Sequence, residues 1–236
     1  MRTPLCSQYA IAVRREIKYV FRNTDPETLR ALLRSELEQV SYSDKPFSRV
    51  NSLYFDTETY TSYRDSVEGN DRRVKLRVRW YGDARTPSPC SLEIKHRRGD
   101  MCVKERITLP GITNAWNKTP RDFTSIVTRT LIASNKTRWQ HYAYPTVFIS
   151  YQREYFIDIK TGIRCTLDYG LEYQNTHIST APLLHTMNSL GSTVIVEIKT
   201  RTTDAYGEHF PAFLKEWRMQ KSSKYVSAIH HCFSFA

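Results

Sequence analysis

The chain has 236 residues, 40% of them hydrophobic and 12% aromatic, which is enough to bury a substantial core in one domain spanning residues 1–236. Because 35 Lys and Arg outnumber 24 Asp and Glu, the formal charge is +11, and we expect a phosphate-rich partner such as nucleic acid, an anionic membrane or a nucleotide. The five cysteines are scattered, which excludes a disulfide framework or a zinc motif and favours the reducing cytoplasm. Because the sequence has no long apolar run, we expect no signal peptide and no transmembrane segment.

The pattern along the chain predicts a mixed α+β fold with more strands than helices. A polar cap at 23–25 followed by Pro26 begins a helix whose apolar stripe includes Leu29, Leu33 and Leu37. Strands are expected at residues 11–21, 50–56, 72–81, 90–97, 102–109, 146–158, 163–169 and 192–200. Helices are expected at 25–38, 119–135, 206–219 and 222–233, with a turn or short helix after residue 56 and a mobile insertion at 174–190.

One face of the strand at 72–81 is charged. Lys75, Arg77 and Arg79 alternate with Leu76 and Val78, so the cations share one side of the strand. The same alternation recurs at Arg14, Glu16 and Lys18, at Glu93 and Lys95, at Lys104 and Arg106, at Tyr151 and Arg153, at Arg164, Thr166 and Asp168, and at Glu197 and Lys199. Like charges on neighbouring strands repel, which indicates a polyanion or metal-bound phosphate that offsets them. Periodicity alone fits equally a sandwich with charged outer faces and a closed barrel with a charged channel.

Eight short motifs carry a family resemblance. They are residues 14–19, 52–56, 75–82, 92–95, 151–153, 164–168, 196–199 and 221–225. Together and in this order they resemble the VTC domain, the polyphosphate polymerase branch of the triphosphate tunnel metalloenzymes, over about residues 11–230. The resemblance implies an antiparallel eight-stranded β-barrel, a triphosphate tunnel, with helices packed outside.

The resemblance also implies a metal-dependent phosphotransferase. The activity would be that of an ATP-dependent inorganic polyphosphate polymerase, which transfers the ATP γ-phosphoryl group to a growing polyphosphate chain. Such a transfer requires mainly alignment and neutralisation of charge, so a cage of Arg and Lys around one metal ion suffices. ATP and polyphosphate are then the expected partners. Nucleic acid is not expected, because the strands lack an exposed aromatic stacking pattern, and the basic composition leaves peripheral association with a membrane partner open.

The site residues follow from the same resemblance. The expected catalytic, phosphate-holding residues are Lys18, Arg77, Arg79, Lys95, Lys104, Arg153, Arg164, Lys221 and Lys224. Additional lining is expected from Lys75, Arg106, Lys199, Ser223 and Tyr151. Glu197 matches the carboxylate that holds Mn²⁺ or Mg²⁺, with an ion pair to a neighbouring cation as its alternative role. Glu16 is expected either to support the metal or to pair with a tunnel cation.

One departure from the family pattern separates the candidate activities. The hydrolytic and cyclase branches commonly carry Glu-x-Glu-x-Lys on the first strand, where this chain has Arg14, Glu16 and Lys18. Loss of that carboxylate disfavours a second metal or a metal-activated water and favours the polymerase, unless Glu93, Glu105 or Asp168 supplies another ligand. The alternatives are a triphosphatase or tripolyphosphatase of the same fold and a non-catalytic polyphosphate-binding sensor.

Overall fold

A computed structural model describes residues 14–42, 44–83, 89–99, 101–109, 112, 115–177, 181–183, 187–201 and 210–234. The strands are β1 Arg14–Arg22, β2 Glu38–Val40, β3 Ser48–Asp56, β4 Arg72–Tyr81, β5 Cys90–Arg98, β6 Met101–Leu109, β7 Tyr144–Ile157, β8 Arg164–Asn175, β9 Asn188–Ser189 and β10 Thr193–Arg201. The helices are α1 Pro26–Arg34, α2 Thr61–Glu68, α3 Pro120–Ala133 and α4 Lys224–Ser234, with 3₁₀ helices at Thr137–Tyr142 and Ala212–Glu216.

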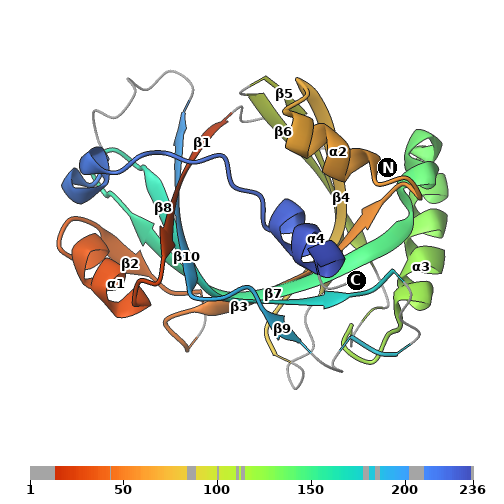
Figure 1. Cartoon of the computed structure of the whole chain (residues 1–236), viewed down its shortest axis with the longest axis horizontal. Helices are drawn as coiled ribbons and strands as arrows, with labels where there is room; N and C mark the ends of the chain where they lie inside the picture. Colours follow the sequence, from red (N-terminus) through yellow and green to blue (C-terminus); the bar gives the residue numbers. More distant parts are fainter. Residues whose placement is uncertain are drawn as a thin grey trace, which may run out of the picture.

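The long strands of the described chain form one antiparallel, curled sheet. Its order is β1-β10-β8-β7-β3-β4-β5-β6, while β2 pairs with β7 and β9 pairs with β8. The sheet bends into an arch, so that strands from its two ends face each other (Figure 1). Lys95 on β5 reaches Glu16 on β1, with 2.7 Å between Nζ and Oε2, although no backbone ladder joins β1 to β6 among the described residues. The predicted α+β tunnel fold is confirmed in this half-barrel form, and the sandwich is excluded.

Helices α1 and α3 cover the apolar outer face of the arch (Figure 1). Phe123 of α3 packs with Leu76 and Trp80, and α1 lies over β1, β8 and β10. Local sequence explains where both helices begin. Asp25 and Thr119 accept backbone N–H bonds as N-caps, and a proline occupies the first turn in each case.

Helix α4 differs from the expectation that the C-terminal region would help to cover the outside. It lies within the arch (Figure 1), where Tyr225 stacks on Tyr54 with 5.1 Å between ring centroids. Tyr54 is the register partner of Arg77, so α4 packs on the same face as the charged residues. Part of that inner face is apolar, including Val147 and Ile149, and α4 buries it.

Several element boundaries differ from those predicted. The helix expected at 25–38 ends at Arg34, because Glu38–Val40 joins the sheet as β2. The helix expected at 206–219 is present only in part: Ala212–Glu216 forms a 3₁₀ helix, residues 217–219 are not helical, and residues 202–209 lie outside the described chain. Residues 217–221, termed the edge segment below, instead follow the free edge of β1, where the Gln220 N–H donates to the Lys18 carbonyl at 2.9 Å.

Two expectations fall partly outside the described residues. Residues 11–13 of the first predicted strand are not described, nor are 178–180 and 184–186 of the segment 174–190. The described parts of that segment include the end of β8 at Asn175 and the short strand β9. Its mobility stays a prediction.

Candidate functional site

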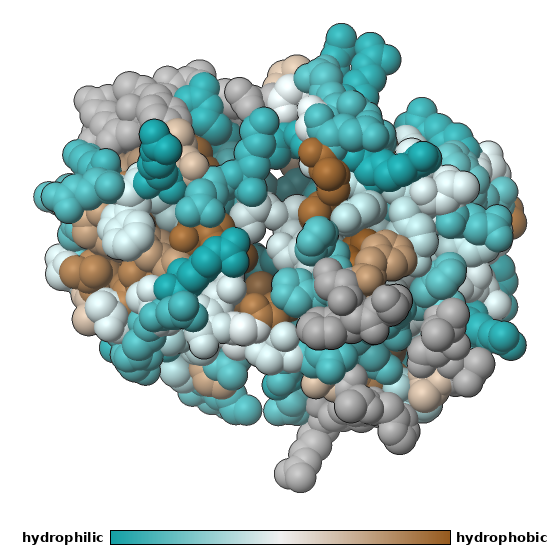
Figure 2. All heavy atoms as spheres, viewed as in Figure 1, coloured by the Kyte–Doolittle hydropathy of each residue, from teal (hydrophilic) through white to brown (hydrophobic). Residues whose placement is uncertain are grey.

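The inner face of the sheet gathers cations from strands that are distant in sequence. Figure 2 shows a hollow near the middle of one face of the molecule, bordered mainly by hydrophilic residues. Register pairing places Arg77 beside Glu93, Lys75 beside Lys95, and Lys18 beside Glu197. Since cross-strand partners share a face, the sheet brings these expected residues together along one surface.

Glu93 is the hub of the β4–β6 wall. Its side chain is buried and accepts from Arg77 Nε and Nη2 at 2.8 and 2.6 Å, while Lys104 Nζ lies 3.2 Å from its other oxygen. Arg79 Nη1 lies 3.9 Å away, and Arg77 Nη1 also donates to the Tyr54 hydroxyl at 3.0 Å. Burial alone would raise the pKa of Glu93, but the positive charges of Arg77, Arg79 and Lys104 hold it far below its ordinary value. Glu93 therefore stays ionised and fixes the orientation of the cations around it.

A second buried carboxylate, Asp168, organises the β7–β8 wall. Arg153 binds it with two prongs, at 2.6 and 2.7 Å, and Lys224 Nζ donates to it at 2.5 Å. Burial opposes ionisation, yet these two cations lower the pKa of Asp168 to about 2. Lys224 also lies 4.6 Å from the centroid of the Tyr151 ring, a cation–π contact that anchors the start of α4.

Glu197 and Glu16 form the carboxylate pair of the β1–β10 wall. Glu197 lies 3.0 Å from Lys199 Nζ and 3.6 Å from Lys18 Nζ, and despite burial these cations keep its pKa well below the ordinary value. Glu16 forms an ion pair with Lys95, at 2.7 Å between Oε2 and Nζ, and its role in supporting a metal stays a prediction. Burial would raise the pKa of Glu16, but Lys95 outweighs it and the pKa lies below the ordinary value.

The donor set at Glu16 and Glu197 limits which metal these walls can hold. The described part of the chain contains no group of three or more His, Cys, Asp or Glu that could hold a metal ion. The two carboxylates are near enough for the charge of Glu197 to oppose ionisation of Glu16. They fit a hard divalent cation that takes most of its ligands from phosphate oxygens and water, and not a cation that needs a cage of protein ligands.

Lys75 and Lys18 connect the walls to the residues that precede α4. Lys75 Nζ donates to Ser223 Oγ at 2.8 Å, and the same Oγ accepts the Val226 N–H at 3.3 Å as the cap of α4. Lys18 Nζ donates to the Ser222 carbonyl at 3.0 Å. Burial, reinforced by the charges of Lys18 and Lys95, lowers the pKa of Lys75 to about 7. Near neutral pH this side chain thus exists as a mixture of the ammonium and the amine.

Three expected site residues lie at the margin of this network. Arg106 and Arg164 are exposed, although register places Arg106 opposite Glu93 and Arg164 opposite Lys199 on the inner face. Lys221 is exposed on the edge segment. None of the three forms an ion pair with another residue that the structure describes.

The suggestion that Glu105 supplies a metal ligand inside the tunnel is wrong. It is the register partner of Ile94 and therefore lies on the outer face, where it pairs with His96 at 2.7 Å and with Lys136. By contrast, Glu93, which the sequence suggests only as an additional metal ligand, is a central residue of the inner face and contacts three cations. Its place in the alternation with Lys95 was the available signal, but its partners on β4 and β6 depend on strand register.

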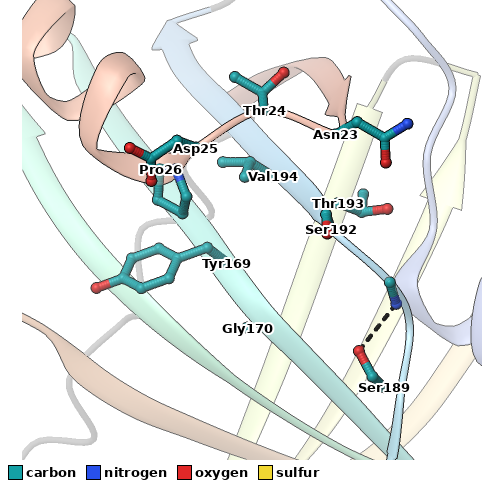
Figure 3. Close-up of a pocket in the computed structure, with 11 residues that line it drawn as sticks. Asn23, Thr24, Asp25, Pro26, Tyr169, Gly170, Ser189, Ser192, Thr193 and Val194 are labelled. Carbon is teal, nitrogen blue, oxygen red and sulfur yellow. Dashed lines mark hydrogen bonds between the residues drawn. The ribbon is translucent and has the colours of Figure 1, made fainter.

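A separate pocket of about 580 Å³ lies where the β1–α1 turn meets β8 and the β9–β10 connection (Figure 3). It is lined by polar and small residues, including Asn23, Ser189 and Thr193, and by no Lys or Arg. Its carboxylate, Asp25, already caps α1. The pocket is therefore poorly suited to an anionic ligand, and the inner face of the sheet remains the candidate site.

A curled antiparallel sheet with Arg and Lys held inside by buried carboxylates defines a tunnel protein suited to a phosphate-rich polyanion. The VTC domain family model matches residues 13–233, and the chain belongs to this family, which is associated with polyphosphate polymerases and the triphosphate tunnel fold. No curated protein matches the chain. Among the described residues, no helix combines the length and apolar character needed to cross a membrane.

Proposed function

We propose that this chain is an ATP-dependent polyphosphate polymerase, which transfers the γ-phosphoryl group of ATP to the end of a polyphosphate chain. The observation that carries the proposal is the convergence of Arg77, Arg79, Lys95, Arg153 and Lys18 on one inner surface drawn from both ends of the sheet. Family membership supports the same class of substrate.

The arrangement suits phosphoryl transfer because its cations are held before substrate binds. Glu93 holds Arg77, and Asp168 holds Arg153, so both guanidinium groups are oriented without reorganisation. Fixed donors aimed at developing negative charge are the main source of rate enhancement in this chemistry. Arginine can grip two phosphate oxygens at once, while lysines such as Lys95 and Lys224 act as point charges that let a chain slide. The nucleophile is the terminal oxygen of the acceptor phosphate, so no proton-abstracting side chain is required.

Glu197 and Glu16 are the residues that would hold Mn²⁺ or Mg²⁺. The metal would supply charge neutralisation and orientation of the phosphates. Glu197 additionally keeps Lys18 and Lys199 in place through its ion pairs. These two roles of Glu197 can be separated by experiment. If Glu197 binds the metal, its substitution should raise the metal concentration that the reaction requires, whereas loss of its ion pairs alone should not.

The test is to incubate the purified protein with ATP and Mn²⁺ and to follow ADP release and polyphosphate chain length on a gel. We expect growing chains with the unchanged protein, and a loss of about 100-fold or more for Arg77→Ala, because a preorganised cation facing the transferring group is removed. Arg72→Ala is the matched control, since Arg72 lies on the same strand in the opposite orientation. Glu197→Gln should raise the Mn²⁺ concentration needed for half-maximal rate, whereas Arg77→Ala should not.

The other outcomes are equally readable. Phosphate release without chain growth would contradict the polymerase and indicate a triphosphatase. Tight polyphosphate binding without ADP release, and without dependence on metal, would indicate a binding-only sensor.

A further inference from the structure

The charged inner face of β4 and β5 continues past the residues assigned above. Moving outward along β4, Arg79, Arg77 and Lys75 are followed by Arg73 at the next inner-face position. The register pairs Arg73 with Arg97, directly beyond the Lys75–Lys95 pair. Arg73 is partly buried and Arg97 is exposed, so the row leads from the interior to the surface. The strand geometry places Arg73 roughly 13 Å along β4 from Arg77.

Arg73 and Arg97 bring two positive charges opposite each other on neighbouring strands, an arrangement that attracts an anionic ligand. Arg97 Nε donates to the Gly99 carbonyl at 2.8 Å, so its own hairpin holds it in place. Burial and the charge of Arg97 lower the pKa of Arg73, and they outweigh the opposing effects of Asp71 and Asp65. The register thus brings the charge of Arg97 close enough to oppose that of Arg73 at this end of the strands.

We propose that Arg73 and Arg97 form an outer subsite for inorganic polyphosphate, which binds the part of the chain that extends beyond the residues holding a triphosphate. The inference rests on the proposed function for the identity of the ligand. A triphosphate held at Arg77 and Arg79 spans less than the distance to Arg73, whereas a longer chain crosses the Lys75–Lys95 pair and reaches it. The subsite thus distinguishes long polyphosphate from tripolyphosphate and from ATP.

The chain offers a matched control. Arg72 and Arg98 are register partners on the same two strands, one position further out. Both are exposed, and strand alternation turns them to the outer face. The double variants Arg73→Gln/Arg97→Gln and Arg72→Gln/Arg98→Gln therefore remove the same charge from the same hairpin on opposite faces.

Binding is measured without ATP by titrating fluorescently labelled long-chain polyphosphate, and by calorimetry with tripolyphosphate. For Arg73→Gln/Arg97→Gln we expect the Kd for the long chain to rise about fivefold for each arginine removed, the size typical of a cation beside an anionic surface. The Kd for tripolyphosphate should change less than twofold. The Arg72→Gln/Arg98→Gln variant should bind both ligands nearly as the unchanged protein does. Thermal unfolding of each variant verifies the fold, which should survive because Arg97 is exposed and Arg73 is only partly buried.

Each other outcome overturns the inference. If Arg73→Gln/Arg97→Gln weakened the binding of both ligands equally, the two arginines would belong to the triphosphate site. If it weakened the binding of neither, they would have no role in binding. If Arg72→Gln/Arg98→Gln weakened the binding of the long chain as much, the effect would come from general surface charge. The polymerase proposal fails separately: a protein that binds long chains through Arg73 and Arg97 but never lengthens them keeps the subsite and loses the activity.

Discussion

At the scale of single residues, buried carboxylates determine where the cations lie. Glu93 contacts Arg77 and Lys104, and Asp168 contacts Arg153 and Lys224. The sequence predicted the cationic positions well, because alternation assigns Lys75, Arg77 and Arg79 to one face without further information. It could not predict which carboxylate holds which cation, since this depends on register and on side chains that meet across the interior.

Replacing Glu93 by Gln should destabilise the protein by about 3 kcal/mol or more, because it leaves Arg77 and neighbouring cations buried without their counter-charge. The measurement is urea unfolding at neutral pH. Glu105→Gln, on the partly exposed outer face of the adjacent strand, is the control and should cost about 1 kcal/mol or less. If the two variants lost the same free energy of unfolding, the buried ion pairs of Glu93 would contribute no more to stability than the partly exposed pairs of Glu105.

Lys75 should make phosphate binding depend on pH around neutrality. Its pKa of about 7 lies below the unfolded value of about 10.4, so in the folded protein the charged form is lost as pH rises through 7. We expect the affinity for long-chain polyphosphate, measured by calorimetry, to fall between about pH 6 and about pH 9, with proton uptake on binding in the upper half of this range. Stability changes in the opposite sense, increasing from about pH 7 to about pH 10 as the unfolded chain alone retains this proton.

Two variants isolate this effect. Lys75→Arg keeps its charge throughout the range and should bind with a flatter pH profile, whereas Lys75→Met should bind weakly at every pH. An unchanged slope in Lys75→Arg would assign the pH dependence to another group.

At the scale of elements, the sequence predicted the positions of the strands but not where the C-terminal region packs, with α4 inside the arch. A period of two along β4, β5 and β10 is unambiguous, so these strands were predicted within two residues of their bounds. The apolar stripe of α4 predicted a helix but carries no information on which face of the sheet it covers. Residues 217–219 of the edge segment were predicted as the end of a helix. The sequence could not reveal their position beside β1, because the bond that fixes it joins Gln220 to the distant Lys18.

Tyr225→Phe tests what fixes α4 inside the arch. The Tyr225 hydroxyl donates to Asp56 at 2.5 Å, and Asp56 also accepts the backbone N–H groups of Ser62 and Tyr63 at the start of α2. Loss of a hydrogen bond to a buried carboxylate should cost about 1.5–3 kcal/mol and speed hydrogen exchange in α4. Tyr42→Phe, at a side chain that is 71% exposed, is the control and should leave both measurements unchanged. Unaltered exchange in Tyr225→Phe would show that packing alone holds the helix.

At the scale of the whole molecule, the buried ion pairs should make the fold sensitive to acid. The pKa of Asp168 is about 2, below the unfolded value of about 3.9, and that of Glu197 is also lowered. Their contribution to stability is complete above about pH 4 and disappears as pH falls towards 2, because the unfolded chain binds these protons first. Urea unfolding between about pH 6 and about pH 2.5 should show this loss, and Asp168→Asn, less stable at neutral pH, should lose less on acidification. A stability that stays constant over this range would contradict the assigned ion pairs.

In the described part of the chain, β1 and β6 stand at the two ends of the sheet order and no backbone ladder joins them, which affects how a long polymer would be held. A polymer inside a ring that is closed by a continuous backbone ladder can leave only by its ends. Here the described wall is completed between β1 and β5 by the Lys95–Glu16 pair, and the edge of β1 is covered by the bonds of the edge segment to Lys18 and Val20. The Lys95–Glu16 contact is an ion pair, and a bound polyanion that attracts Lys95 weakens it. A long polyanion thus meets a wall that is joined at this point by side chains, which can separate and re-form more readily than a backbone ladder.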